Sequence, residues 1–409
     1  MYARKKEAKI INDPIYGFVQ INKGIIYNLI EHPFFQRLRR ISQLGLSYLV
    51  YPGAYHTRFH HALGCLFLMN RAIEQIRKKG HIITNKEAEA VKIAILLHDI
   101  GHGPFSHALE KSIVSHIKHE TMSLLYMEEL NRQYNGKLSL AIKIFRNKYK
   151  KKFLHQLVSS QLDMDRLDYL NRDSFYSGVQ EGVIGTERII NMLNIVDDNL
   201  VIEEKGTYSI EKFLIARRLM YWQVYLHKTV LSAENTLIKI LKRAKELIHE
   251  KKSIFTTPAL LFFLENNITK NKLEGDNNLL RKFAELDDHD IYTCLKQWIN
   301  NKDIVISKLS DSIVNRRLLK VKITKKPFSK KLILEKKKSV MKDLGINIDL
   351  ADYFVFSHKI SNRAYFNGKS DINILLKDGN IRKLRYSSDL NLGQVLSRKV
   401  DKFFLCFLN

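Results

Sequence analysis

Residues 93–107 of this 409-residue chain read IAILLHDIGHGPFSH, and this stretch decides the fold that we expect. Apolar residues recur at helical spacing up to an adjacent His98-Asp99 pair. Two glycines and a proline follow, and they favour a turn that carries His102 and His107. An unpaired aspartate buried after Ile-Leu-Leu would be costly, and a bound cation compensates for that cost. The stretch therefore predicts an apolar helix with a metal-binding pair at its end.

Two further segments supply residues of the same kind. In HTRFHHALGCLFLM (residues 56–69), Arg58 and His61 stand three apart at the start of an apolar helical run. In LDMDRLDYLNRD (residues 162–173), Asp165, Tyr169 and Asp173 are spaced by four, which places them along one helical face. The competing interpretations are a satisfied core histidine for His61 and a salt-bridged surface helix for the second segment. Leucines between the polar positions favour partial burial of that helix.

A second His-Asp pair in the chain serves as a control. His289-Asp290 lies in LDDHDIY, among acidic neighbours and without a following glycine or histidine. This context is typical of a helix cap or a solvated surface rather than of a metal site.

The pattern of the whole chain predicts a mostly α protein. Residues 9–25 form short β-branched runs around a turn, which predicts a small N-terminal hairpin. Helical periodicity dominates from about Tyr27 to His249, and after about residue 300 strand-like runs appear, with a hairpin turn predicted at residues 377–380. We therefore expect a domain over residues 1–252 and a C-terminal α+β domain of unknown role over residues 253–409.

Composition narrows the class of protein. Lys and Arg number 68 against 42 Asp and Glu, and the resulting +26 charge attracts phosphates, nucleotides, nucleic acid or an anionic membrane. The three cysteines have no spacing typical of a zinc site or a disulfide framework. No segment approaches the roughly 18 apolar residues of a membrane span. A cytoplasmic protein that does not insert in a membrane is the expectation.

The ordered set HTRFHHALG, HDIGHGPFSH, KHET and DMDRLDYLNRD resembles the HD-domain superfamily. The similarity is greatest to its deoxynucleoside triphosphate triphosphohydrolases, the branch that includes the vertebrate SAM-and-HD-domain enzyme and bacterial relatives. It extends from about Lys9 to Lys228. The resemblance implies an HD-type helical core and a metal-dependent phosphohydrolase.

The resemblance also implies roles for the residues of the motifs. The metal ligands would be His61, His98, Asp99 and Asp165, a mixed nitrogen and oxygen set that suits one divalent ion of Fe, Mn, Zn, Co, Ni or Mg. His119 matches the catalytic histidine, with Glu110 in the place of its acidic partner, and His102 and His107 match contacts to the α-phosphate. In the family the metal holds the α-phosphate and activates a water.

Substrate contacts follow from the same resemblance. Gln43 and Asp173 match residues that bind the sugar 3′-hydroxyl, beside Tyr169, and Arg58 matches a triphosphate contact. Arg166 stands where the mammalian enzyme has lysine, so the charge is kept but the geometry differs. Tyr225, in MYWQVYLHKT, matches the tyrosine that leaves no room for a 2′-hydroxyl. The competing interpretation of this aromatic run is ordinary helix packing.

A regulatory nucleotide and a homo-oligomer are a further hypothesis drawn from the resemblance. In the tetrameric mammalian enzyme, nucleotides bind between subunits at positions that match Lys9, Asn12, Glu31, Gln36, Arg39, Val50, Tyr51, Arg188, His227 and Lys228. Two departures count against it, because Glu31 replaces an aspartate and Gln223 replaces an arginine. Gln36 and Arg39 can also simply share a helix with Gln43.

The leading expectation is hydrolysis of deoxynucleoside triphosphates to deoxynucleoside and inorganic triphosphate. One alternative is an HD-type phosphomonoesterase or phosphodiesterase acting on another nucleotide, because fold and metal site do not fix the leaving group. The other is a basic nucleic-acid-binding protein with a secondary HD site. Against this last alternative, the basic residues look scattered and no nucleic-acid-binding motif is recognised.

Overall fold

The computed structural model describes residues 8–105, 109, 112–113, 117–362, 371–387 and 399–408, and most of them are helical. The chain begins with an antiparallel hairpin of β1 (Ala8–Asp13) and β2 (Gly17–Asn22), as predicted. The Asp13 carboxylate accepts hydrogen bonds from the backbone N–H groups of Ile15 at 2.9 Å and Tyr16 at 3.0 Å. Gly17 has a φ of 73°, a conformation that glycine adopts without strain. Local turn chemistry therefore explains this hairpin.

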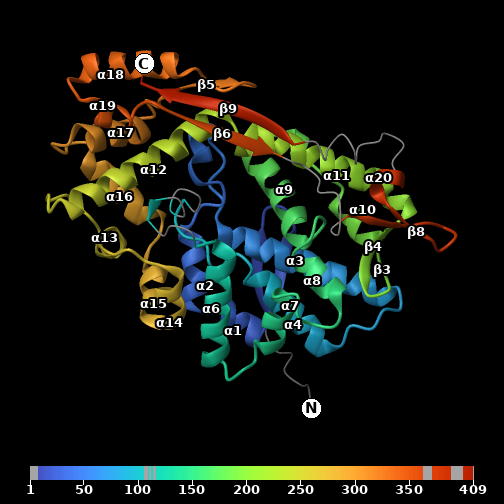
Figure 1. Cartoon of the computed structure of the whole chain (residues 1–409). Helices are drawn as coiled ribbons and strands as arrows, with labels where there is room; N and C mark the ends of the chain where they lie inside the picture. Colours follow the sequence, from blue (N-terminus) through green and yellow to red (C-terminus); the bar gives the residue numbers. More distant parts are fainter. Residues whose placement is uncertain are drawn as a thin grey trace.

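The predicted helical core follows the hairpin (Figure 1). Its central helix, α3 (Arg58–Lys78), packs against both α4 (Asn85–Leu96) and α9 (Met164–Ser177). The predicted metal ligands lie on α3 and α9 and directly after α4. The other helices of this part are α1 (Ile25–Glu31), α2 (Pro33–Gln36), α6 (His119–Gln133), α7 (Ser139–Phe145), α8 (Lys152–Val158), α10 (Thr186–Asn191), α11 (Thr207–Met220) and α12 (Lys228–His249).

A short hairpin that the sequence analysis did not predict lies within the segment where helical periodicity dominates. It consists of β3 (Leu193–Val196) and β4 (Asn199–Glu203), joined by Asp197 and Asp198, which both have positive φ. Aspartate tolerates this left-handed conformation better than most residues, so the Asp-Asp pair was the local signal for a turn. Helices do dominate from Tyr27 to His249, and the β3–β4 hairpin is a short exception to that pattern.

The C-terminal part mixes helices and strands, as predicted, and includes a three-stranded sheet. In this sheet β9 (Val400–Phe407) lies between β5 (Lys320–Thr324) and β6 (Phe356–Asn362), antiparallel to both. Figure 1 shows the sheet above α12, with α18 (Lys330–Leu344) on its outer side. The remaining helices are α13 (Pro258–Glu265), α14 (Lys270–Gly275), α15 (Asn277–Glu285), α16 (Asp288–Trp298), α17 (Ile304–Val314), α19 (Ile348–Ala351) and α20 (Leu384–Ser387).

The His289-Asp290 control pair lies in the first turn of α16. Asp287 caps this helix, and Asp290 completes a capping box with it. The cap interpretation of this pair is therefore correct. The adjacent Asp288 accepts hydrogen bonds from the backbone N–H groups of Ser42 at 2.8 Å and Phe105 at 3.2 Å. The start of α16 thus fastens the C-terminal part to two loops of the helical core.

A second sheet also joins the two parts of the chain. Strands β7 (Asn373–Leu375) and β8 (Ile381–Lys383) form the hairpin predicted around residues 377–380. Strand β7 pairs in parallel with β4, placing Ile374 beside Ile202. The segments before and after residue 252 therefore share a sheet. Among the described residues, no helix is long and apolar enough to cross a membrane.

Candidate active site

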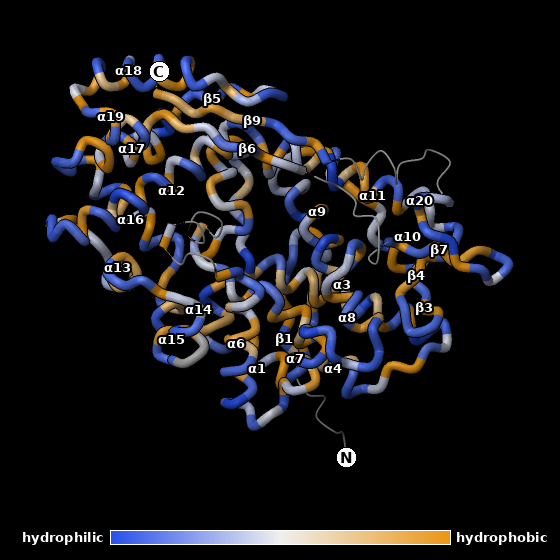
Figure 2. The backbone as a smooth tube through the Cα atoms, viewed as in Figure 1, coloured by the Kyte–Doolittle hydropathy of each residue, from blue (hydrophilic) through white to orange (hydrophobic). Residues whose placement is uncertain are grey.

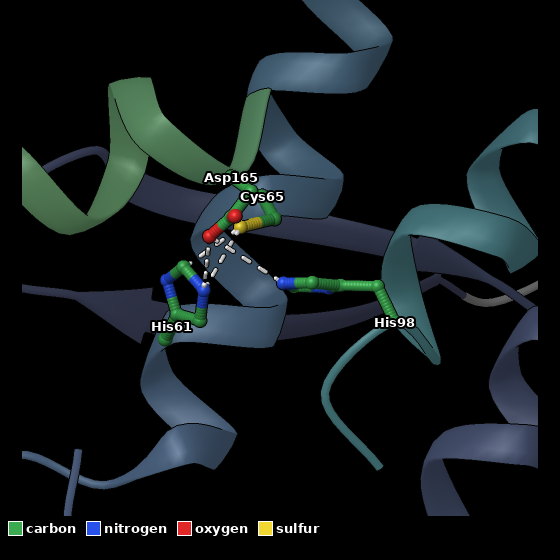
Figure 3. A group of neighbouring side chains, drawn as sticks. All are labelled: His61, Cys65, His98 and Asp165. Carbon is green, nitrogen blue, oxygen red and sulfur yellow. Dashed lines mark hydrogen bonds and ion pairs between the residues drawn. The ribbon is translucent and has the colours of Figure 1, made fainter. Parts of the chain in front are cut away.

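The four residues predicted as metal ligands converge in the helical core. His61 comes from the first turns of α3, Asp165 from the first turn of α9, and His98 and Asp99 from the turn after α4. Figure 3 shows His61, His98 and Asp165 directed toward one another. Asp165 Oδ1 lies 3.2 Å from His61 Nε2 and 3.5 Å from His98 Nε2. Asp99 Oδ1 lies 3.4 Å from His98 Nε2, which completes a compact donor set.

Close packing holds the turn that carries the His98-Asp99 pair. Helix α4 ends at Leu96, and the Ser123 hydroxyl then donates to the His98 carbonyl at 2.6 Å and accepts from Gly101 N–H at 2.9 Å. A Cβ at Gly101 would lie 2.2 Å from the Ser123 backbone nitrogen. This glycine is therefore needed for the close approach of α6, in addition to the turn that the sequence predicted.

Both histidine rings are oriented by hydrogen bonds on their outer nitrogens. His61 Nδ1 lies 2.7 Å from Asp168 Oδ2, and His98 Nδ1 lies 2.6 Å from the Ile95 carbonyl. These contacts direct each Nε2 toward Asp165, the arrangement typical of metal-binding histidines. Among the described residues, none provides a hydrogen-bond partner for His98 Nε2, which is buried. A buried lone pair without a donor is satisfied by a metal ion, so the donor set fits a divalent cation.

Sequence reasoning missed the residues that support His61. Asp168 also receives hydrogen bonds from Arg172, at 2.9 Å from Nε and 3.0 Å from Nη2, and Arg172 pairs with Asp13 at 2.9 Å. All four side chains are buried. A chain of charges therefore links the N-terminal hairpin to the donor set. Its only sequence signal was the spacing of Asp168 and Arg172 by four within the quoted α9 motif.

Cys65, which was not a predicted ligand, lies close enough to His61, His98 and Asp165 to share a metal ion with them. Its Sγ is 3.6 Å from both ring nitrogens of His61, one turn along α3 (Figure 3). Burial raises the pKa of the Cys65 thiol far above its usual range. Because the thiolate is the metal-binding form, this shift disfavours Cys65 relative to the two histidines and Asp165 as a ligand.

The electrostatics of the donor set favour positive charge at its centre. Burial opposes ionisation of Asp165, but His61 and His98 outweigh it and lower the pKa of this carboxyl. Burial likewise disfavours protonation of His98, yet Asp99 and Asp165 raise the pKa of its ring. Asp99 is further paired with Arg58 Nη1 at 2.5 Å. The cluster thus attracts a cation.

The predicted catalytic histidines are next to this cluster. The rings of His102 and His119 stack with centroids 3.9 Å apart, and His102 Nε2 lies 3.3 Å from Asp99 Oδ1. Burial, followed by the nearby Arg58 charge, lowers the pKa of His102. Glu110 and His107 lie outside the described residues. The structure therefore places His102 and His119 beside the donor set and says nothing of the other two.

All six predicted substrate residues line one cavity of about 1190 Å³. The same cavity reaches His98, Asp99, His102, His119 and Asp165. The cavity-lining residues predicted as substrate contacts are Gln43, Arg58, Arg166, Tyr169, Asp173 and Tyr225. Helix α12 and strands β6 and β9 complete the wall, so the C-terminal part closes the cavity.

Arginines give the cavity wall unpaired donors. Arg217, which sequence reasoning missed, is buried on α11, and its Nε and Nη1 atoms have no hydrogen-bond partner in the described part of the chain. The buried Nε atoms of Arg58 and Arg166 also lack partners, although these side chains pair with Asp99 and Asp163 through other nitrogens. Buried guanidinium groups with free N–H bonds are suited to an anionic ligand.

Hydrogen bonds also hold the polar side chains of Tyr225 and Asp173 in the cavity wall. Tyr225 donates to Asp173 Oδ2 at 2.6 Å, and Asp173 Oδ1 lies 2.7 Å from His56 Nε2. Tyr225 ends a π-helical turn, Tyr221–Tyr225, and its ring meets Tyr169 and Tyr221 edge to face at centroid distances of 6.1 and 5.2 Å. Irregular π-helical turns of this kind occur often at functional sites.

The residues of the regulatory hypothesis fall into two groups. In one, Lys9 pairs with Glu31 at 2.5 Å, and Arg39 Nε donates to Gln36 at 2.9 Å. In the other, Tyr51 donates to the Gln223 carbonyl and lies against His227, which caps α12 beside Lys228. Arg188 instead donates to the Lys205 carbonyl at 3.0 Å. Asn12 is exposed on β1, and Val50 is half-buried.

Comparisons with known proteins agree with this geometry. The HD domain family matches residues 58–173, and the HD associated region matches residues 184–258. A phosphohydrolase structure from Bacteroides thetaiotaomicron is 53% identical, with a TM-score of 0.96 over 98% of this chain and 100% of that one. The uncharacterized protein YwfO of Bacillus subtilis is 37% identical over 76% of this chain and 71% of its own.

A relative with a named activity is more distant. The deoxynucleoside triphosphate triphosphohydrolase SAMHD1 homolog of Dictyostelium discoideum is 30% identical over 74% of this chain and 63% of its own length. The matched HD domain spans all four residues of the donor set. From the ordered motifs, the buried donor set and these matches, we conclude that the chain belongs to the HD-domain superfamily of metal-dependent phosphohydrolases.

Proposed function

We propose that this chain hydrolyses deoxynucleoside triphosphates to a deoxynucleoside and inorganic triphosphate. One observation carries the proposal. A single cavity connects the donor set with three arginines and with the hydrogen-bonded pair Asp173–Tyr225. These features suit, respectively, a reacting phosphate, a polyphosphate chain and a sugar.

The arginines account for the polyphosphate part of the substrate. Arg58, Arg166 and Arg217 face the cavity with N–H bonds that lack partners. Each guanidinium can give charge-assisted hydrogen bonds to phosphate oxygens, which are stronger than neutral ones. A nucleoside or a monophosphate would leave part of this donor array unsatisfied, so the array favours a triphosphate.

We infer that His61, His98, Asp99 and Asp165 hold one divalent ion. Such an ion supplies charge neutralisation at the phosphate and lowers the pKa of a bound water. Asp168 and the Ile95 carbonyl keep the two imidazoles oriented for this role. The donor set alone does not distinguish Fe, Mn, Zn, Co, Ni and Mg.

We assign His119 the protonation of the leaving oxygen. Its ring is held against His102 and borders the cavity beside the donor set. General acids of this kind contribute about 100-fold or more to a rate. Glu110, the proposed acidic partner, and His107, the proposed second phosphate contact, keep these roles as predictions.

The sugar end of the cavity explains the proposed preference for deoxynucleotides. Gln43 Oε1 is buried without a partner and can accept from a 3′-hydroxyl, and Asp173 is oriented by His56 and Tyr225. Because the Tyr225 ring is held by its hydroxyl and by two neighbouring tyrosines, it forms a rigid wall. A rigid wall excludes an added 2′-hydroxyl more effectively than a mobile side chain.

Product identification tests this proposal against the two alternatives. Metal-loaded protein is incubated with all four dNTPs and four NTPs, and the products are separated by anion-exchange chromatography. The proposal predicts deoxynucleoside and inorganic triphosphate from dNTPs. Release of orthophosphate or pyrophosphate would favour a phosphomonoesterase or phosphodiesterase, and the absence of hydrolysis with nucleic-acid binding intact would favour the binding protein.

A further inference from the structure

One segment of the C-terminal part concentrates the positive charge of the chain. Residues 316–342 contain twelve lysines and arginines but a single acidic residue, Glu335, so this segment of 27 residues carries +11 of the total +26. The expectation that basic residues are scattered was therefore wrong for this segment. We call the exposed cations of residues 316–342 the β5–α18 surface.

The fold brings the cations of β5 and α18 to one side of the three-stranded sheet. Lys320 pairs across the sheet with Phe407, so the two side chains lie on the same face. Lys322 Nζ lies 5.9 Å and Lys336 Nζ 4.5 Å from the centre of the Phe407 ring. Strand β5 is an edge strand, and α18 lies over this face of the sheet (Figure 1).

Most of these cations have no carboxylate partner. Among the described residues, only Lys337, paired with Asp352 at 2.5 Å, and Arg317, paired with Asp311 at 3.4 Å, form ion pairs within the segment. Four lysines of α18 are exposed to solvent and form no ion pair with any described residue: Lys330, Lys331, Lys338 and Lys342. Repulsion among unpaired like charges is relieved by an anionic ligand that contacts several of them together.

We propose that the β5–α18 surface binds the phosphate backbone of nucleic acid. Helix α18 has 15 residues and is therefore about 22 Å long. A nucleic-acid duplex presents about 13 phosphates along that length, which is enough for the six lysines of α18 to contact phosphates together. No base-reading motif is needed, because contacts to the backbone give affinity without sequence preference.

The packing of α18 favours nucleic acid over a membrane surface. An interfacial helix inserts its apolar face into the bilayer. In α18 that face is already used, because Val340 is buried and Leu332, Ile333, Met341 and Leu344 pack against the core. Figure 2 shows the alternation of hydrophobic and hydrophilic residues along this helix. What remains outward is mainly charge, which suits a polyphosphate.

The surface is separate from the cavity. His358 and Phe404 pair across the sheet and line the cavity. Phe407 belongs to the opposite face, because it is an odd number of residues from Phe404 along β9. His358 and Phe404 therefore meet the cavity from one face of the sheet, and Phe407 lies with Lys320, Lys322 and Lys336 on the other face. Nucleic acid and a small nucleotide substrate are expected to bind independently.

The lysines of β5 also have an interpretation that requires no ligand. Lysines on an edge strand discourage edge-to-edge aggregation, and this role needs no ligand. It applies to Lys320 and Lys322, which belong to the strand. It does not explain the four unpaired lysines of α18, so these four are the residues to test.

The test compares two variants of equal charge. In the surface variant, Lys330, Lys331, Lys338 and Lys342 are replaced by glutamine. In the control variant, Lys78, Lys86, Lys137 and Lys296, which are exposed elsewhere, are replaced in the same way. Circular dichroism first establishes that both variants are folded. Fluorescence anisotropy then measures their affinity for a labelled 20-base-pair DNA duplex and for a 20-nucleotide RNA, at salt concentrations from 50 to 300 mM.

The proposal predicts a specific change in salt dependence. Each lost phosphate contact reduces the slope of log affinity against log salt by about 0.9 for duplex DNA, so the surface variant should lose about 3 to 4 units of slope. Its affinity at low salt should fall at least about tenfold, while the control variant and basal nucleotide hydrolysis stay unchanged.

Several results would overturn the assignment. If the two variants lose affinity for nucleic acid equally, the effect comes from the overall net charge and not from the β5–α18 surface. If millimolar dGTP displaces the duplex, the duplex binds in the cavity and not at the β5–α18 surface. The protein is also tested on vesicles that contain 30% phosphatidylserine. If it binds these vesicles more tightly than nucleic acid, and the surface variant loses this binding, the β5–α18 surface binds membranes instead.

Discussion

At the residue scale, the neighbouring histidines His60 and His61 make different contacts. His61 Nε2 faces Asp165 at 3.2 Å, whereas the adjacent His60 accepts from the Thr57 backbone N–H and completes the capping box of α3. We therefore expect His61→Ala to abolish metal content and hydrolysis with the helical fold preserved. His60→Ala should keep both and lose only about 1 kcal/mol of stability, the usual value of a cap. Metal analysis after gel filtration measures this, and full occupancy in His61→Ala would contradict the assignment.

Tyr225 provides a second prediction, which rests on the proposed function. Tyr225→Ala should reduce the preference for dNTPs over NTPs, because it opens space beside the proposed 2′ position. Tyr225→Phe should discriminate better than Tyr225→Ala, because the ring remains although its hydrogen bond to Asp173 is lost. The ratio of kcat/KM for dATP and ATP is the measurement. Equal ratios in wild type and Tyr225→Ala would exclude a sugar gate.

Where a motif contained the predicted site residues, the sequence predicted which of them lie close together. His61, His98, Asp99 and Asp165 lie within quoted motifs and converge as expected. Arg217 lies outside those motifs, and its burial beside the cavity depends on the approach of α11 and α9. Such residues follow from tertiary packing, which local periodicity does not encode.

At the element scale, the approach of α3 to α9 depends on one glycine. A Cβ at Gly64 would lie 1.9 Å from Asp168 Oδ1 and 2.3 Å from Arg172 Nη2. Both side chains are buried and hydrogen-bonded to each other, so neither has room to move. We expect Gly64→Ala to destabilise the fold by about 2 kcal/mol, because this overpacking exceeds the gain of about 1 kcal/mol in helix propensity.

Chemical denaturation and metal analysis together test the role of Gly64. Because the displaced Asp168 orients His61, metal affinity should fall along with stability. Asp168→Ala removes the colliding carboxylate, so the double variant should cost less than the sum of the single changes. Additive costs, or a Gly64→Ala protein as stable as wild type, would show that α3 and α9 tolerate separation.

Elements with local signals were predicted and elements with long-range partners were not. The N-terminal hairpin and the β7–β8 turn follow from Asp and Gly positions. The sequence analysis missed β3–β4 inside a helical stretch, and it did not foresee β9, whose position between β5 and β6 depends on residues far away in the chain. Strand pairing of this kind is set by tertiary contacts.

At the scale of the whole molecule, the proposed domain division at residue 252 stays a prediction. The parts before and after it share the β4–β7 pairing, the Asp288 contacts and one cavity wall. The sequence indicated a change near residue 252 from helical periodicity to a mixture of helical and strand-like patterns. It did not indicate that the C-terminal part closes the cavity, because His358 and Phe404 belong to no recognised motif.

Assembly is the prediction that belongs to the whole molecule. We hypothesise a homo-oligomer stabilised by a nucleotide near Arg39, whose guanidinium lies 3.6 Å from the Phe59 ring centre. A nucleotide shifts assembly only if it binds the assembled state more tightly, so protein concentration and effector affinity must be coupled. Sedimentation with GTP or dGTP should then show a larger mass together with a higher initial rate on a second dNTP.

The Arg39→Ala variant distinguishes this hypothesis from simple substrate binding. It should lose the nucleotide-dependent change in mass but keep hydrolysis at high protein concentration, because Arg39 is absent from the cavity wall. If mass and rate ignore millimolar nucleotide, or if Arg39→Ala responds like wild type, the regulatory site is wrong and the catalytic assignment is unaffected.

The central claim is that water attacks the α-phosphorus of a deoxynucleoside triphosphate bound in this cavity. Hydrolysis of dGTP in ¹⁸O-labelled water, followed by mass spectrometry of the separated products, tests it most directly. The account predicts one ¹⁸O atom in inorganic triphosphate and none in deoxyguanosine. Label in orthophosphate or pyrophosphate, or in the 5′-hydroxyl of deoxyguanosine, would contradict it.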